Sequence, residues 1–226
     1  MVALTGVIIT RNEERHIAAA IASLACCDEI LVVDSESTDR TREIAEKCGA
    51  RVLLHPWEGY AAQKNFAAAA AAHHWILSLD ADERVSAELA AELYDWKRST
   101  PSATAGSMPR RVFYLGAWIR HSGWYPDRKI RLYRRDQARW EGDFVHERLV
   151  TTGTIHQFSG DILHFPYPSW NDHMQRIERY THLAAKAAKE NRRRGNPVRL
   201  LLGPPLEFLR TLVFRGGILD GWRGAR

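Results

Sequence analysis

Cysteine is scarce in this sequence. The 226 residues include only three cysteines, Cys26, Cys27 and Cys48, and no Cys-x-x-Cys pair. An odd number of cysteines cannot close into a disulfide framework, and thiolate metal sites need cysteines at short, regular spacings. The composition therefore argues against a disulfide-stapled secreted domain and against a thiolate metal centre. It favours a reducing compartment such as the cytoplasm.

Long hydrophobic runs are also absent. No segment reaches the roughly 18 uninterrupted apolar residues that a membrane-spanning helix needs. The first residues, MVALTGVIIT, have neither the positive charge nor the cleavage site of a signal peptide, and we interpret them as a β-strand. These absences predict a cytoplasmic protein that is soluble or lies on the inner face of the cell membrane.

Charge is distributed unevenly along the chain. The net charge is +5, and residues 186–226 hold ten basic residues against three acidic ones, a balance of +7 that leaves −2 for the rest. A basic tail on a mildly acidic body predicts contact with an anionic surface, either lipid or nucleic acid. With 45% hydrophobic and 26% charged residues, the chain is typical of a globular protein with one core.

Short apolar runs alternate with helical stretches in residues 1–97. Such alternation predicts a mostly parallel, Rossmann-like α/β sheet with helices on both faces. We expect strands at 4–9, 30–33, 52–54 and 75–79, and helices at 14–25, from Ser37 or Thr38 to Gly49, at 61–72, and from Ser86 to about Lys97.

The pattern changes after Lys97. Residues 98–168 are rich in glycine, proline, arginine and aromatic residues, with strand-like pieces at 111–115 and 130–133. We interpret this segment as a β-rich extension of the same domain that completes a pocket. Residues 169–226 then form a third segment of C-terminal helices.

The C-terminal segment contains two helix signals. A capping box from Ser169 to Asp172 predicts a long helix to about Arg194. Gly203-Pro204-Pro205 interrupts the pattern, and we expect a second helix to restart there and run to Phe214. The second helix is basic and amphipathic, which predicts that it lies in the headgroup region of an anionic membrane, aided by Arg192 to Arg194. Packing on the core or on a second subunit is the alternative.

Polar residues gather where three of the predicted strands end. Thr10, Asn12 and Glu13 follow the first strand, Asp34 ends the second, and Asp80-Ala81-Asp82 follows the fourth. In open α/β sheets, ligands bind outside the carboxyl ends of the strands. Each residue alone also has a structural explanation: Asn12 as a helix cap, Asp34 as a turn residue and Asp80 in an Asx-turn. Their occurrence together favours a binding edge.

The two carboxylates of Asp80-Ala81-Asp82 suit a hard cation such as Mg²⁺ or Mn²⁺. Diphosphate oxygens would fill the open coordination positions, and the cation would neutralise charge on a departing nucleoside diphosphate. His146 and His164 are candidates for a third metal ligand or a phosphate contact, although a single histidine is more often packed or solvated.

Glycine is missing from the segment that follows the first strand. Thr10-Arg11-Asn12-Glu13-Glu14-Arg15 contains no glycine, which argues against a sugar-phosphate nucleotidyltransferase and against a dinucleotide-dependent oxidoreductase. A phosphatase of the haloacid dehalogenase type would place its nucleophile after the first strand, whereas Asp34 follows the second. A non-enzymatic module that binds an anionic surface stays open, and the leucine and phenylalanine content of the tail favours lipid over nucleic acid.

Four blocks of the sequence resemble one family. They are Thr10-Arg11-Asn12-Glu13-Glu14, Val32-Val33-Asp34-Ser35-Glu36-Ser37-Thr38-Asp39-Arg40-Thr41, Gln63-Lys64-Asn65 and Leu79-Asp80-Ala81-Asp82-Glu83. In this order and spacing, residues 4–95 resemble family 2 glycosyltransferases. Trp140-Glu141-Gly142, Val145-His146-Glu147 and the ending Phe214 to Gly221 resemble the subgroup of lipopolysaccharide-core glucosyltransferases.

The resemblance implies a GT-A fold, a UDP-sugar donor and inverting transfer. By position, the nucleotide would contact Thr10, Asn12, Glu13, Asp34, Lys64 and Asp80, and the metal would be held by Asp82 with Asp80. Many relatives carry Asp-Asp-Gly-Ser where this chain has Asp34-Ser35-Glu36-Ser37, so the contact of Asp34 with the base is open.

Inverting transfer needs a carboxylate that takes the proton of the acceptor hydroxyl. Glu141, Asp143 and Glu147 are the candidates, and we favour Glu147 because the subgroup resemblance centres on His146-Glu147. A surface salt bridge is the alternative for each. Cations from Arg128 to Arg135 would lie at the rim of the pocket and contact donor phosphate or an anionic acceptor, or else form a solvated strand face.

These features predict a metal-dependent glycosyltransferase. It would move a hexose, with glucose favoured, from a UDP-sugar to a saccharide or glycolipid acceptor at the membrane, as in synthesis of lipopolysaccharide core or another cell-envelope glycan.

Overall fold

The computed structural model describes residues 1–226 except 100, 143–146, 168, 191–196 and 225–226. The chain forms two compact units: unit 1 holds residues 1–110 and 128–164, and unit 2 holds residues 111–127 and 165–226. These limits differ from the predicted segments 1–97, 98–168 and 169–226, because residues 98–110 and 128–164 pack with the first segment and residues 111–127 pack with the last.

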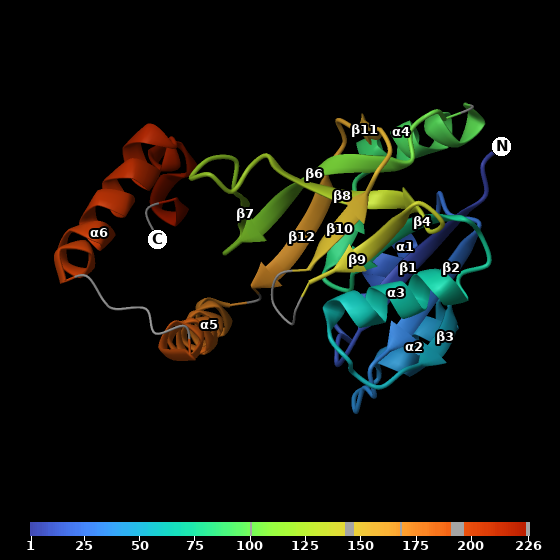
Figure 1. The fold of residues 1–226 in the computed structure, drawn as a ribbon, viewed down its shortest axis with the longest axis horizontal. Helices are drawn as coiled ribbons and strands as arrows, with labels where there is room; N and C mark the ends of the chain where they lie inside the picture. The colour runs from blue at the N-terminus through green and yellow to red at the C-terminus, as the bar shows by residue number, and fades with distance from the viewer. Residues whose placement is uncertain (100, 143–146, 168, 191–196, 225–226) are drawn as a thin grey trace. The chain divides into compact units, whose positions relative to one another are not determined.

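The first part of unit 1 alternates between strands and helices, as predicted (Figure 1). Strands β3, β2, β1 and β4 are neighbours in this order, and all three pairings are parallel. The elements are β1 (Leu4–Thr10), α1 (Ile17–Ser23), β2 (Glu29–Asp34), α2 (Thr41–Lys47), β3 (Arg51–Leu54), α3 (Tyr60–Ala70), β4 (Trp75–Asp80), β5 (Glu83–Val85) and α4 (Ala87–Arg98).

Side chains of β1 alternate between two hydrophobic cores, because successive residues of a strand point to opposite faces. Leu4 and Ile8 belong to the cluster that includes residues of α1 and α4. Val7 and Ile9 belong to the cluster that includes Ala67 of α3. The predicted arrangement of helices on both faces of the sheet is confirmed.

The second part of unit 1 extends and curls the same sheet. The strand order is β3-β2-β1-β4-β8-β6-β12-β5, while β11 pairs with β6 and β9 pairs with β10. Only Ala81 and Asp82 separate β4 from β5, so the path from β4 to β5 through the other strands must curl back on itself. The added strands are β6 (Ala105–Tyr114), β8 (Asp127–Arg134), β9 (Ala138–Glu141), β10 (Arg148–Thr151), β11 (Ile155–Gln157) and β12 (Ile162–Tyr167). Residues 111–114 of β6, Asp127 of β8 and residues 165–167 of β12 belong to unit 2.

Unit 2 combines β7 (Ala117–Trp118), paired with the end of β6, with α5 (Trp170–Glu190), α6 (Pro197–Leu209), the π-helix η1 (Arg210–Phe214) and the 3₁₀ segment η2 (Gly217–Arg223). Of the predicted capping box, the bond to the Ser169 side chain is present: the hydroxyl of Ser169 accepts from the N–H of Asp172 at 3.2 Å, and it also donates to the carboxylate of Asp172. The predicted end of this helix at Arg194 lies outside the described residues. No helix in the described part of the chain has the length and hydrophobicity to cross a membrane.

The predicted break at Gly203-Pro204-Pro205 is wrong. Helix α6 runs from Pro197 to Leu209 and contains both prolines. The ring of a proline in a helix clashes with the Cβ of the residue before it. Gly203 has no Cβ and so removes this clash before Pro204, whereas Pro205 follows Pro204 and has no such relief. The helix instead changes at Arg210, where the π-helix η1 begins and runs to Phe214.

Candidate functional site

The ends of three parallel strands place the predicted site residues along one edge of unit 1. Thr10 is the register partner of Asp34 in the pairing of β1 with β2. Ile9 is the register partner of Asp80 in the pairing of β1 with β4. Parallel pairing therefore brings Thr10, Asp34 and Asp80 to the same edge.

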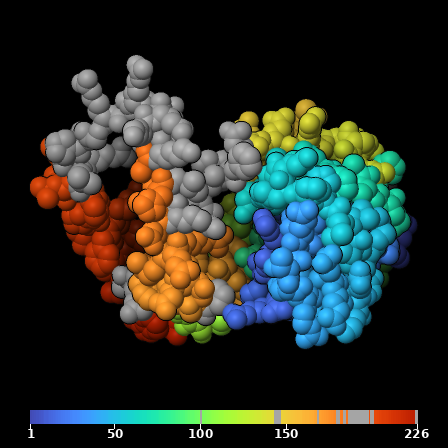
Figure 2. Space-filling view, turned by 90° about the horizontal axis from the view of Figure 1, so that it is seen from below, coloured from blue at the N-terminus to red at the C-terminus, as the bar shows by residue number. Residues whose placement is uncertain are grey.

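The loops after β1 and β2 are locked together by side chains of the predicted motif. Asp34 is fully buried and accepts from the N–H of Ser37 at 2.8 Å and from its hydroxyl. The Ser37 hydroxyl oxygen in turn accepts from the N–H of Asn12 at 2.8 Å, and the side-chain oxygen of Asn12 accepts from the N–H of Thr38 at 2.8 Å. Figure 2 shows the two segments, blue and light blue, side by side.

These contacts test two structural explanations that the sequence allowed: Asn12 as a helix cap and Asp34 as a turn residue. Helix α1 begins at Ile17, so Asn12 does not cap it and instead ties the two loops. Asp34 does close a turn, through Ser37. The N–H of Glu13 adds a further tie, because it donates to the hydroxyl of Thr41 at 2.8 Å. The motif thus builds a rigid frame at the strand ends.

Glu36 explains how the chain accommodates its departure from Asp-Asp-Gly-Ser. The backbone of Glu36 has φ +58°, in the left-handed region that favours glycine. Its side chain is exposed. The turn geometry that glycine would adopt freely is therefore kept by a residue that adopts it under strain.

A buried network of charges surrounds Asp80. Lys64 Nζ lies 3.0 Å from Asp80 Oδ1, and Arg131 Nη2 lies 2.8 Å from Asp80 Oδ2. The same Arg131 nitrogen lies 2.7 Å from Glu83 Oε1, and Arg110 Nη1 lies 3.3 Å from that oxygen. Glu83 Oε2 accepts from the N–H of Asp80 at 3.0 Å, which closes the turn between β4 and β5.

The network determines the ionisation of its members. Burial by itself would raise the pKa of Asp80, but the charges of Arg131 and Lys64 outweigh it and hold that pKa well below its usual range. Burial likewise would lower the pKa of Arg131, whereas Asp80 and Glu83 raise it. Asp80 is therefore an ionised carboxylate with both oxygens already paired to cations.

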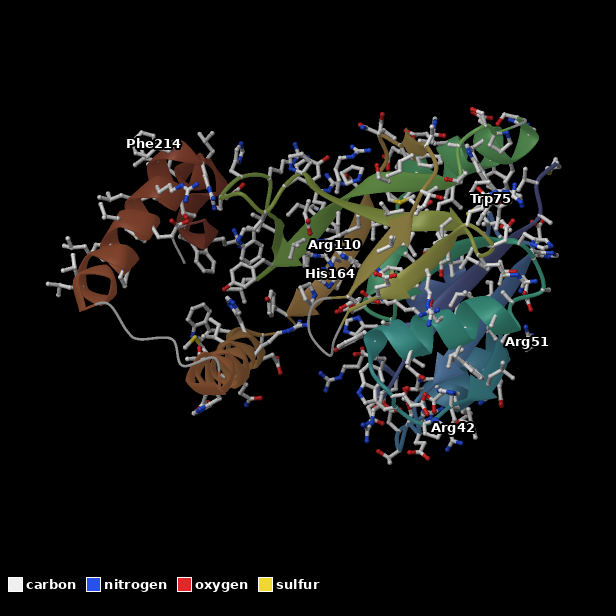
Figure 3. The ribbon with its side chains drawn as sticks, viewed as in Figure 1. Arg42, Arg51, Trp75, Arg110, His164 and Phe214 are labelled. Carbon is white, nitrogen blue, oxygen red and sulfur yellow. The ribbon has the colours of Figure 1, made fainter. Side chains whose placement is uncertain are left out.

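Asp82 has a different neighbour. His164 Nε2 lies 3.3 Å from Asp82 Oδ2. His164 is the register partner of Glu83 in the pairing of β12 with β5, so the strand pairing itself brings the imidazole to Asp82. Figure 3 labels His164 near Arg110, on the neighbouring strands β12 and β6.

A carboxylate and an imidazole at this distance form a donor pair for a divalent cation such as Mn²⁺. The Nδ1 of His164 is buried and has no hydrogen-bond partner in the part of the chain that the structure describes. Among the described residues, no cluster of three His, Cys, Asp or Glu side chains is suited to a metal. The pair therefore fits a cation whose other ligands come from phosphate and water.

The region around β9 connects to the same network. Glu147 Oε1 lies 3.3 Å from Lys64 Nζ, and this ammonium lies 4.4 Å from the centre of the Trp140 ring. Asn65 holds the backbone of Trp140 on both sides, with its amide donating to the carbonyl at 2.9 Å and its oxygen accepting from the N–H at 3.0 Å. Of the other candidate bases, Glu141 is exposed at the end of β9, and Asp143 lies outside the described residues, as does His146.

Sequence reasoning missed three buried residues of the site. Arg131 was interpreted as a rim cation, which is wrong, because it is only 4% exposed and pairs with Asp80 and Glu83. Glu83 and Gln63 belong to the blocks that resemble the family but were given no role. Gln63 joins the ends of two strands by donating to Ser35 Oγ at 2.6 Å and to the carbonyl of His55 at 3.2 Å. Membership of these blocks was the one sequence signal for Glu83 and Gln63.

His16 was also missed. Asp82 lies near enough to affect the ionisation of His16. Burial lowers the pKa of His16, and the charge of Asp82 raises this pKa by a smaller amount. Two other predicted rim cations have structural partners. Arg128 donates to the carbonyls of Ser107 and Phe158, and Arg135 donates to carbonyls at the end of α3.

Known proteins resemble this chain in sequence and in fold. The sequence profile of Glycosyl transferase family 2 matches residues 5–159. Lipopolysaccharide core biosynthesis glycosyltransferase LpsC of Rhizobium meliloti (strain 1021) is 32% identical over 227 residues, which cover 97% of this chain and 83% of LpsC. An uncharacterized glycosyltransferase of Rickettsia conorii, RC0292, is 50% identical over 91 residues, 40% of this chain and 32% of its own length.

A solved structure resembles the fold. Mannosyl-3-phosphoglycerate synthase from Rubrobacter xylanophilus has a TM-score of 0.54 and 16% sequence identity, covering 86% of this chain and 76% of that one. This likeness concerns the fold alone. It agrees with the predicted GT-A architecture, which is confirmed.

The strained turn at Glu36 gives a prediction about stability. Glu36→Gly should leave the free energy of unfolding unchanged or raise it by up to about 1 kcal/mol, because glycine adopts a positive φ without strain. Ser37→Ala should lower it by about 1–3 kcal/mol, because the N–H of Asn12 and the carboxylate of Asp34 lose a partner. Urea denaturation of both variants measures the difference. A large loss of stability in Glu36→Gly would contradict the strain argument.

The network around Asp80 gives a prediction about pH. Because the folded pKa of Asp80 lies below the unfolded one, its ion pairs stabilise the protein at neutral pH, and this contribution disappears as the pH falls below about 4. Asp80→Asn should cost about 3 kcal/mol at neutral pH and should flatten the loss of stability on acidification. Glu58→Gln, at an exposed position, is the control. Equal acid dependence in wild type and Asp80→Asn would refute the assignment.

Proposed function

The chain belongs to glycosyltransferase family 2 and is a glycosyltransferase, and from this premise we propose that it transfers a hexose, with glucose favoured, from a UDP-sugar to a membrane-associated saccharide or glycolipid. The similarity to LpsC along nearly the whole chain supports a role in synthesis of lipopolysaccharide core or a related cell-envelope glycan. The observation that carries the proposal is the shared edge of β1, β2 and β4, where Asp34 and Asp80 end their strands and Asp82 follows Asp80 by two residues.

The frame of two interlocked loops supports a nucleotide site. We assign Thr10, Asn12, Glu13 and Asp34 to the nucleoside. Both carboxylate oxygens of Asp34 accept hydrogen bonds from Ser37, so Asp34 would contact the base from a fixed position. Lys64 and Asp80 would lie on the diphosphate and ribose side.

We assign the divalent cation, Mg²⁺ or Mn²⁺, to Asp82 and His164, with Asp80 as the alternative carboxylate. The pairing of both Asp80 oxygens with Lys64 and Arg131 favours Asp82 for this role. When bound, the cation would neutralise the charge of the leaving diphosphate. The protein's own contribution is to hold Asp82 beside His164 through the pairing of β5 with β12.

We assign the base to Glu147. Inversion requires a carboxylate that removes the proton of the acceptor hydroxyl while the anomeric carbon is attacked from the face opposite the diphosphate. The contact of Glu147 with Lys64 supports the assignment, because it ties this carboxylate to the residue that also contacts Asp80. Asp143 and Glu141 are the alternatives.

We propose further that the enzyme is cytoplasmic and binds the inner face of the membrane through residues 186–226. The +7 balance of this segment supports attraction to anionic lipid. Peripheral attachment would bring the site to an acceptor that is itself embedded in the membrane.

Removal of the proposed metal ligand tests the nucleotide site. Asp82→Ala should abolish the increase in UDP affinity that Mn²⁺ or Mg²⁺ produces, because the cation loses its charged ligand, and His164→Ala should weaken it. Isothermal titration calorimetry with UDP, with and without metal, measures this effect. Asp95→Ala, at an exposed aspartate of α4, is the control. Unchanged UDP affinity of Asp82→Ala in the presence of metal would count against the ligand role.

Replacement of the proposed base separates binding from transfer. Glu147→Gln should keep donor binding and lower the rate of transfer by about 10²–10⁴-fold, because the amide cannot accept the proton. Glu141→Gln should retain activity. The measurement is transfer from a radiolabelled UDP-sugar to membrane extract, with donor affinity determined separately. Full turnover by Glu147→Gln would move the base to Asp143 or Glu141.

A further inference from the structure

The end of unit 2 exposes large apolar side chains that the site does not use. Phe214 is 85% exposed, Ile218 66%, Leu219 71% and Trp222 53%. Phe214 points outward from the chain (Figure 3). We call residues 213–222 the apolar turn. It coincides with the sequence ending that resembles the lipopolysaccharide-core subgroup, for which the proposed catalytic site offers no role.

The apolar turn is anchored to the rest of unit 2. The Asp220 side chain is only 5% exposed, and its carboxylate accepts from the N–H groups of Arg120 at 3.1 Å and His121 at 2.9 Å. The His121 Nδ1 lies 3.0 Å from the same carboxylate. Arg223 Nε donates to the carbonyl of Leu115 at 2.8 Å, and the carbonyl of Arg215 accepts from Ser122 at 2.9 Å. Both ends of the turn are therefore fixed.

Glycines make this conformation specific to the sequence. Gly216 and Gly221 have φ values of +66° and +65°, which residues other than glycine rarely adopt. A Cβ on Gly217 would lie 2.8 Å from Ser122 Oγ and 2.9 Å from the carbonyl of Thr211. The exposed side chains are thus presented by a turn that is already ordered, and little conformational entropy is lost when they are buried.

Charge indicates what covers the turn. Arg210 and Arg215 share one acidic partner, Glu207, at 3.3 Å and 3.6 Å. Arg223 lies over the ring of Trp222, 4.7 Å from its centre, a pairing suited to the boundary between headgroups and acyl chains. Two copies of the basic segment 186–226 would repel each other, whereas anionic headgroups would attract it. These features favour an anionic bilayer over a second copy of the chain.

We propose that the apolar turn inserts Phe214, Ile218, Leu219 and Trp222 into the boundary region of an anionic bilayer, and that Asp220 holds it in the inserting conformation. This inference rests on the proposed membrane attachment and names the residues that carry it. Helix α6 continues the apolar surface, with Leu206 61% and Leu209 51% exposed. The Asp220 anchor distinguishes the proposal from a general attraction of the basic tail to lipid.

Sedimentation of the full chain with vesicles tests the proposal. The wild type should bind vesicles of phosphatidylcholine with phosphatidylglycerol, and bind phosphatidylcholine alone much more weakly. Ile218→Ser with Leu219→Ser should lower the partition coefficient by about 100-fold, because two apolar side chains no longer leave water. The matched control is Leu54→Ser with Ile155→Ser in unit 1, where the side chains are 59% and 43% exposed, and it should bind as wild type does.

Asp220→Ala tests the anchor separately. It keeps every apolar side chain and removes a negative charge, so simple attraction to anionic lipid would strengthen binding, whereas loss of the ordered turn should weaken it. Stronger or unchanged binding would refute the anchor. Wild-type binding by Ile218→Ser with Leu219→Ser would refute insertion. Analytical ultracentrifugation gives a further test. If the wild type is a dimer, and the double variant is a monomer with unchanged vesicle binding, insertion is also refuted.

The rate of UDP-glucose hydrolysis, measured without vesicles, distinguishes a failure of the insertion proposal from a failure of the proposed function. The apolar-turn variants should hydrolyse the donor at the wild-type rate, since their substitutions lie outside the strand-end residues. A chain that binds vesicles through the turn but neither hydrolyses nor transfers any sugar would contradict the proposed function and leave the insertion intact.

Discussion

The buried ammonium of Lys64 is the interaction on which the site in unit 1 depends. It lies fully buried, 3.0 Å from Asp80, 3.3 Å from Glu147 and over the Trp140 ring. A buried ammonium without partners would be strongly destabilising. The folded chain must therefore bring α3, the end of β4 and the segment after β9 together, and the bonds between Asn65 and Trp140 hold that junction at the level of the backbone.

Arg131 and Glu83 extend this pairing of buried charges to the strands where the sheet curls back from β8 to β5. Glu83 lies on β5, Arg131 on β8 and Arg110 on β6, so their ion pairs join three strands. A buried charge pair adds little net stability compared with apolar packing, but it strongly penalises arrangements in which one partner is missing. The network therefore selects the arrangement of β5 that places Asp82 beside His164. Fold and site are specified by the same charges.

Sequence reasoning predicted the parallel half of the sheet because its signals are local. Apolar runs define β1, β2 and β4, alanines define α3, and Ser86 caps α4 as expected, accepting from Leu89 at 3.2 Å. Arg131 was misread because a strand with arginines at 128, 131 and 134 and a lysine at 129 gives no sign of which cation has a buried carboxylate opposite it. That information depends on the pairing of β8 with β4, more than 40 residues away in the chain. The continuous α6 was missed because a Gly-Pro-Pro sequence ordinarily ends a helix.

The two aspartates of Asp80-Ala81-Asp82 show how partners assign different chemistry to identical side chains. Asp80 is flanked by Lys64 and Arg131, which hold its pKa low and occupy both oxygens. Asp82 faces an imidazole instead, 3.3 Å away, which supplies a second donor atom for a cation. In the proposed enzyme the motif is then not a symmetrical pair of ligands. The first carboxylate joins the buried network that orients the turn, and that orientation leaves the second carboxylate for the metal and the diphosphate.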